Sequence, residues 1–102
     1  MKVVLTDEAK AQVRERRAWW RKNRVHKGLF DEAIRAARGV LMQAPKLMVH
    51  GRLDGLDVRR LSMSKVHCFV YYTIDEERGV ATIVSVWGQE VEQQPRFVDD
   101  DK

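Results

Sequence analysis

The chain has 102 residues, 44% of them hydrophobic and 33% charged, which indicates one globular domain and excludes a disordered chain. Its formal net charge of +4 favours phosphate groups or acidic proteins as partners, and its single cysteine, Cys68, excludes an internal disulfide. No apolar run approaches the roughly 20 residues of a membrane span, and the N-terminus lacks the layout of a signal peptide, so we expect a cytoplasmic protein. No Cys/His cluster suggests a metal site, and we expect no cofactor.

The chain begins with an apolar run that predicts a short edge strand from Lys2 to Leu5. Thr6 follows as a suitable N-cap, and two acidic residues come directly after it, where the helix dipole favours negative charge. We therefore expect a first helix from about Asp7 to Lys22, with Asn23 at its end.

A second helix is indicated by apolar residues at the spacing of one buried helix face. It is expected to run from His26 or Lys27 to Gln43, because Pro45 cannot continue a helix. The apolar face comprises Phe30, Ala33, Ile34, Ala37 and Leu41. Since only a few residues join the two helices, we expect them to form an antiparallel hairpin.

The second half of the chain predicts three consecutive strands. Lys46 to Leu56 is expected to be a connecting stretch with glycine turns. The strands that follow are expected at Asp57 to Met63, Val66 to Asp75 and Val80 to Trp87. Helices grouped before consecutive strands predict an α+β fold, in which the hairpin packs on one face of an antiparallel sheet that this meander completes.

Charge is distributed unevenly along the chain. Lys10 to Lys27 contains eight lysines and arginines against one acid, whereas Asp75 to Lys102 contains eight acids against three basic residues. Such a basic segment attracts phosphates or an acidic protein partner, and the alternative is an ordinary solvated helix face. One domain is expected over residues 1–97, followed by a charged, disordered tail from Val98 to Lys102.

Few groups on the predicted strands can carry chemistry. Arg59 and Arg60 are adjacent, so they point to opposite faces, and at least one of them is a candidate to bind a phosphate or carboxylate. His67 has a side chain suited to proton transfer near neutral pH, although a hydrogen-bonded surface histidine is the commoner case. Trp19 and Trp20 cannot both face the core, so one of them is a candidate partner contact.

Six segments together resemble a known family. They are Trp19-Trp-Arg-Lys-Asn23, Ala44-Pro45, Val58-Arg-Arg-Leu61, Val70-Tyr-Tyr-Thr-Ile-Asp75, Val84-Ser-Val-Trp87 and a late Pro95. Their order and spacing are similar to those of the RelE/ParE superfamily, the toxins of type II toxin–antitoxin systems, from Lys2 to about Phe97. The resemblance implies the same helical hairpin on an antiparallel sheet, and a cognate antitoxin as partner in a hetero-oligomer.

The superfamily implies two activities. RelE-like members cut mRNA in the ribosome, using basic residues on the sheet in place of a metal, and ParE-like members poison DNA gyrase. This chain departs from the RelE-like set at two arginine positions, where Cys68 and then Gln89 and Glu90 stand, and near its catalytic tyrosine, where Pro95 and Phe97 stand. The C-terminal segment looks closer to ParE.

The sequence therefore predicts a ParE-like toxin that acts by binding DNA gyrase and is neutralised by an antitoxin. The alternatives are a ribosome-dependent mRNA endoribonuclease, with His67 as acid or base and Arg59 as phosphate ligand, and an inactive module that only binds an antitoxin. The residues expected to contact the target are Arg59, Arg60, Lys65, Trp87, Arg96 and Phe97. Those expected to contact the antitoxin are Arg16, Arg17, Trp19, Arg21 and Arg24.

Overall fold

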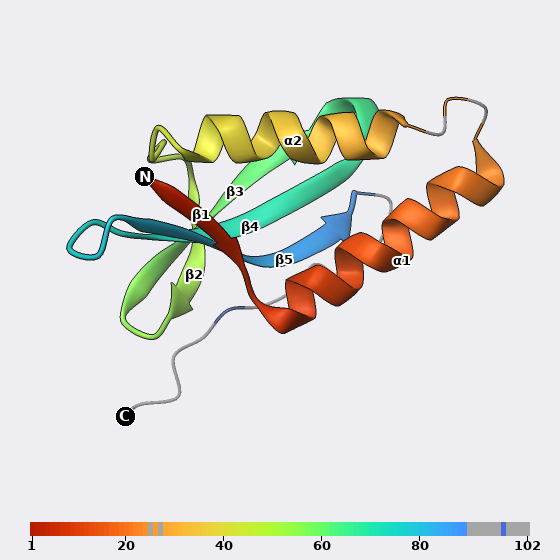
Figure 1. Ribbon diagram of the computed structural model, residues 1–102. Coiled ribbons are helices and arrows are strands. Elements are labelled where there is room, and N and C mark those ends of the chain that lie inside the picture. The colour runs from red at the N-terminus through yellow and green to blue at the C-terminus, as the bar shows by residue number, and fades with distance from the viewer. Residues whose placement is uncertain (25, 27, 90–96, 98–102) are drawn as a thin grey trace.

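In the computed structural model, which describes residues 1–24, 26, 28–89 and 97, five strands form one sheet and two α-helices lie against it (Figure 1). The strands are β1 (Lys2–Leu5), β2 (Val49–Leu53), β3 (Leu56–Met63), β4 (Cys68–Asp75) and β5 (Val80–Gly88). The helices are α1 (Asp7–Asn23), α2 (Leu29–Leu41) and a 3₁₀ turn, η1 (Ser64–Val66). This architecture confirms the predicted α+β fold.

The strands follow the order β1-β5-β4-β3-β2 across the sheet. β3, β4 and β5 form the predicted antiparallel meander, with Arg59 opposite Tyr72 and Phe69 opposite Trp87. β1 instead pairs with β5 in parallel. A parallel pair needs a long crossover connection, which here consists of both helices and the three other strands. The sheet is therefore mixed, where a wholly antiparallel one was expected.

Two other expectations about the sheet were wrong. The stretch from Lys46 to Leu56 contains an edge strand, β2, whose sequence Val-His-Gly-Arg-Leu lacks the regular apolar alternation that predicts a strand. The strand expected from Val66 begins at Cys68 instead, because η1 precedes it and His67 takes a left-handed conformation with φ of 53°. His67 therefore lies in a turn and not in the sheet.

The helix boundaries largely agree with the sequence. Thr6 is the N-cap of α1, since its Oγ1 accepts a hydrogen bond of 3.1 Å from the Ala9 N–H. The second helix is shorter than expected, because it begins after a turn at Gly28 and ends before Met42. Of the other predicted positions, Lys27 and the tail from Val98 to Lys102 lie outside the described residues.

The larger core lies between the helices and one face of the sheet. The buried face of α2, including Phe30 and Ile34, packs there together with Trp20 of α1. The alternate residues Cys68, Val70 and Tyr72 of β4 point into this core, as predicted from their spacing. The opposite face carries a second, smaller cluster built on Val58, Tyr71 and Val84.

Helix α1 closes the edge of β5 that β1 leaves open. β1 pairs with β5 only as far as Ile83, and α1 packs beside the rest of the strand (Figure 1). The Gln12 Oε1 accepts hydrogen bonds from the Val86 N–H at 2.7 Å and from the Ser85 Oγ at 3.2 Å. A side chain thus satisfies a backbone group that a neighbouring strand would otherwise bind.

Replacing Gln12 by leucine should lower the free energy of unfolding by about 1–3 kcal/mol, because the Val86 N–H and the Ser85 hydroxyl lose their acceptor. Gln12→Glu keeps an oxygen acceptor at this place and is the matched control. Urea unfolding of the three chains measures the difference. Equal stability of the parent and Gln12→Leu would mean that the edge is not closed by this side chain.

Candidate functional site

The sheet face opposite α2 is apolar and aromatic, and we call its residues the aromatic face. They are the buried Val58, Tyr71 and Val84 with the half-buried Leu53, Phe69, Trp87 and Phe97 packed against them. The centre of the Tyr71 ring lies 6.4 Å from that of Phe69 and 5.1 Å from that of Phe97. Trp87 and Phe97, two of the predicted target contacts, therefore lie on one surface.

Phe97 is held against the outer edge of β2. It forms an isolated parallel bridge with Gly51, and its carbonyl oxygen accepts a hydrogen bond of 3.1 Å from the Arg52 N–H. Gly51 has φ of 142°, and a Cβ at this position would collide with the Phe97 carbonyl. Only glycine therefore allows the Phe97 backbone to approach β2 so closely.

Arg60 and His50 bring a cation and an imidazole to the aromatic face. The Arg60 guanidinium lies 4.0 Å from the centre of the Phe69 ring, a cation–π contact. The His50 ring meets Tyr71 edge-on at 6.2 Å, and its Nε2 is buried without a hydrogen-bond partner among the described residues. Burial, and then the positive charge of Arg60, lower the pKa of His50 below its ordinary value of 6.5. His50 is thus favoured as a neutral imidazole.

Because the pKa of His50 is lowered on folding, the unfolded chain takes up the imidazole proton first as the pH falls. This contribution to stability should be complete above about pH 7 and be lost as the pH falls through 6.5 towards the folded-state pKa. His50→Phe should make the urea midpoint less sensitive to pH between about 7.5 and 5.5. His26→Gln, at an exposed site, is the control, and an unchanged pH dependence in His50→Phe would contradict the expectation.

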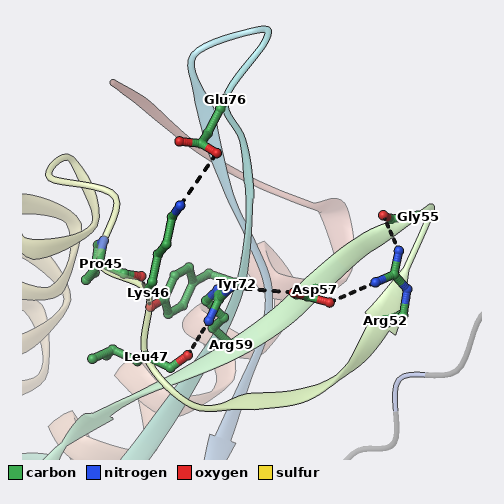
Figure 2. A network of polar contacts seen from close by, with 9 residues as sticks. All are labelled: Pro45, Lys46, Leu47, Arg52, Gly55, Asp57, Arg59, Tyr72 and Glu76. Carbon is green, nitrogen blue, oxygen red and sulfur yellow. Dashed lines mark hydrogen bonds and ion pairs between the residues drawn. The ribbon is translucent and has the colours of Figure 1, made fainter.

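Arg59 lies on the other face of β3, within the polar network of Figure 2. Its guanidinium donates to the Leu47 carbonyl at 2.6 Å and lies 3.5 Å from the Asp57 carboxylate, with 19% of the side chain exposed. The Tyr72 hydroxyl donates to the Pro45 carbonyl at 2.7 Å. Burial raises the pKa of Tyr72, against the opposing effects of a Leu47 backbone hydrogen bond and the Arg59 charge. Through its hydrogen bond to the Leu47 carbonyl, Arg59 ties the segment before β2 to the sheet.

His67 and Arg59 do not lie together. Arg59 pairs with Tyr72, whereas His67 precedes Cys68 at the other end of β4. Four to five residues of extended strand separate them, on the order of 13–17 Å. The structure therefore does not assemble the acid–base and phosphate-binding pair of the predicted nuclease from these two residues.

The arginines of α1 divide between two sides of the helix. Arg17 Nε lies 2.6 Å from Asp31 Oδ1 of α2, and Arg21 lies 3.9 Å from the same carboxylate. On the other side, Trp19 has the Arg16 and Arg24 guanidinium groups at 5.9 and 5.3 Å from its ring centre. The five residues predicted to contact an antitoxin thus form a pair tied to α2 and a cluster around Trp19.

Two adjoining clefts border this cluster and share Arg16 and Trp19. One, of about 390 Å³, opens towards Trp87 at the end of β5, and the other, of about 450 Å³, reaches His67 and Gln89. Trp19 is 40% exposed whereas Trp20 is 5% exposed, which confirms that only one of the two faces the core.

The remaining predicted target contacts lie elsewhere. Lys65 borders a groove between α2 and β3, away from the aromatic face. Arg96 lies outside the described residues. Of the six predicted target contacts, the structure brings together Arg60, Trp87 and Phe97. Their neighbour His50 was not predicted, because β2 was expected to be a loop.

Several kinds of site are not seen in the part of the chain that the structure describes. No group of three or more His, Cys, Asp or Glu residues within these ranges could hold a metal ion. Among the same residues no helix is long and apolar enough to cross a membrane. Cys68 is fully buried, as expected of a small apolar side chain.

The order of strands and the two helices on one face define a RelE-like fold. A solved structure with this fold is a chain in the crystal structure of the archaeal RelE–RelB complex from Pyrococcus horikoshii OT3. The TM-score is 0.58, over 87% of this chain and 94% of that chain, and 12% of the aligned residues are identical. A scan against models of protein families finds no match, and a search of curated proteins finds none. The likeness concerns the fold alone.

Proposed function

We propose that the chain is the toxin of a type II toxin–antitoxin system, that it acts in the cytoplasm, and that it inhibits growth by binding a protein target, DNA gyrase. The RelE-like fold supports the class, since the neighbour with this fold comes from a RelE–RelB complex. The basic, tryptophan-containing side of α1 supports a protein partner such as an antitoxin.

The observation that carries the choice of a protein target is the composition of the aromatic face. Its half-buried members are Leu53, Phe69, Trp87 and Phe97, which suit the desolvated centre of a protein interface. The positions at which RelE-like nucleases are expected to hold arginines carry no cation: Cys68 is buried, and Gln89 Nε2 donates to Ser62 Oγ at 2.8 Å. Arg59 is engaged within the fold.

A second candidate, the mRNA endoribonuclease, is favoured by the position of His50 and Arg60. These residues share the aromatic face, where the His50 ring meets Tyr71 edge-on and the Arg60 guanidinium lies against Phe69. In this candidate His50 would be the acid or base. Arg60 would then bind a phosphate. This pair replaces the separated His67 and Arg59 as the residues on which nuclease activity would depend.

The two candidates are separated by purified components. The chain should inhibit DNA supercoiling by gyrase and co-purify with gyrase, and it should leave a cell-free translation reaction and its mRNA intact. His50→Ala should not change the inhibition, whereas Trp87→Ala should weaken it. Cleaved mRNA in the translation reaction, abolished by His50→Ala, together with normal supercoiling would replace gyrase by the ribosome and mRNA.

A further inference from the structure

We infer that the flanks of α1 and α2 that face each other bind the phosphate backbone of duplex DNA. The choice of DNA rests on the proposed function, because gyrase acts on DNA. We call the basic side chains of these two flanks the basic strip. They are Lys10, Arg14, Arg17 and Arg21 of α1 with Arg35 and Arg38 of α2.

The contacts between the helices show which flank of α1 faces α2. Arg17 Nε lies 2.6 Å from Asp31 Oδ1 of α2, and Arg21 lies 3.9 Å from the same carboxylate. Arg14 and Lys10 precede Arg17 by one and two helical turns, so their side chains leave α1 on the same flank. One row of four cations therefore runs along the side of α1 that is turned towards α2.

The matching flank of α2 begins at Asp31. Arg35 and Arg38 follow at the spacing of one helix face, and the Arg38 guanidinium donates to the Val3 carbonyl of β1 at 3.3 Å. Since β1 leads directly into α1, this contact also places Arg38 on the side of α2 towards α1. Both helices cover the same face of the sheet, so the two rows belong to one surface (Figure 1).

The basic strip carries more positive charge than its own acidic residues compensate. Lys10, Arg14 and Arg35 are exposed, and no acidic side chain of the described residues pairs with them. The acidic residues on the same flanks are Asp7, in the first turn of α1, and Asp31. Six cations against two acids leave a net charge of +4, which favours a polyanion as the ligand.

The length of the row on α1 suits a DNA strand. Lys10 and Arg21 lie about 16 Å apart along the helix axis, at a rise of about 1.5 Å per residue. One strand of a duplex presents a phosphate about every 3.4 Å along its axis, so about five phosphates pass the four cations. Contacts to phosphates fix a protein on the backbone without reading the bases, and binding should therefore be independent of sequence.

The composition of the basic strip favours a duplex over a protein or a single strand. The centre of a protein interface is depleted in charged residues, whereas every member of the strip is charged. Single strands are held by bases stacked on aromatic rings, and no member of the strip is aromatic. The exposed Trp19 lies on the other side of α1, beside Val86 and Trp87 of β5. The aromatic face therefore stays free, so that one molecule can contact gyrase and its DNA together.

The test measures the anisotropy of a fluorescein-labelled DNA duplex of about twenty base pairs, titrated with the full chain at several salt concentrations. The logarithm of the binding constant should fall with the logarithm of the salt concentration with a slope of about −3.5 to −4.5, for four to five neutralised phosphates. Arg14→Gln and Arg35→Gln should each reduce the size of this slope by about 0.9 and weaken binding roughly five- to tenfold at about 0.1 M salt. Two duplexes of unrelated sequence should bind within about twofold of each other.

The matched control is Arg78→Gln, which removes the same charge from the exposed turn between β4 and β5. It should change the binding constant less than about twofold, since it lies off the basic strip and in open solvent. Circular dichroism establishes that each variant is folded.

Absence of DNA binding, or equal losses in Arg14→Gln and Arg78→Gln, would overturn the inference. So would tighter binding of an RNA duplex of the same length that depends on Arg14 and Arg35, because RNA would then replace DNA as the ligand. Supercoiling by gyrase is scored separately. A chain that binds DNA through the strip without inhibiting gyrase would keep the DNA contact and lose the proposed target, and a gyrase inhibitor that does not bind DNA would do the reverse.

Discussion

Gly51→Val is expected to abolish growth inhibition while leaving the chain folded. The valine side chain would occupy the space of the Phe97 carbonyl and force the Phe97 backbone away from β2. Phe97 would then leave the Tyr71 ring, and the aromatic face would lose part of its contact surface. The measurement is colony formation after induction, together with circular dichroism of the purified variant.

Two further variants separate this effect from a general effect of glycine replacement. In Gly39→Ala, on α2, the new Cβ would meet no atom within 4 Å other than those of its chain neighbours and its own helix backbone, and this variant should remain fully toxic. Phe97→Ala keeps the backbone contact with β2 but removes the ring, and it should reproduce most of the loss. Full toxicity of a folded Gly51→Val variant would mean that Phe97 does not contribute to the target contact.

Arg59→Ala is expected to lower the free energy of unfolding by about 1–3 kcal/mol, because the Leu47 carbonyl and the Asp57 carboxylate lose a charged donor in a largely enclosed position. For a domain of this size the melting temperature should fall by roughly 4–8 °C per kcal/mol. Arg78→Ala is the control, since Arg78 pairs with Asp75 while 83% exposed and should cost less than about 1 kcal/mol. Differential scanning calorimetry gives the melting temperatures of the parent, Arg59→Ala and Arg78→Ala.

The toxicity of Arg59→Ala also shows whether Arg59 has a structural or a catalytic role. If it serves only the network of Figure 2, toxicity in Arg59→Ala should fall only as far as the folded protein becomes less abundant. A variant of unchanged stability that had lost all toxicity would contradict the structural role and restore Arg59 as a functional residue.

Elements with a regular apolar spacing or a clear capping residue could be predicted from the sequence. The apolar residues from Phe30 to Leu41 repeat at helical spacing, and Thr6 offered an N-cap, so both helices were found. β2 could not be found in the same way, because His50, Gly51 and Arg52 interrupt its apolar pattern. It is a strand because β3 and Phe97 pair with its two edges, which is a tertiary effect.

The sequence indicated which kinds of residue are candidates for function, but not which of them lie together in the fold. The basic character of α1 was evident, but its division depends on Asp31, a residue of the next helix that reaches Arg17 and Arg21. Arg59 and Arg60 were correctly expected on opposite faces. Which of them is engaged in the fold depends on the Leu47 carbonyl, and a backbone group leaves no signal in the sequence.

Induced expression in a bacterium, with growth, chromosome integrity and bulk protein synthesis scored together, tests the central proposal most directly. We expect growth to stop with broken DNA and an SOS response while translation continues, and co-expression of a cognate antitoxin to restore growth. A prompt arrest of translation with cleaved mRNA and an intact chromosome would contradict the gyrase target. Normal growth in the presence of abundant soluble protein would contradict the toxin itself.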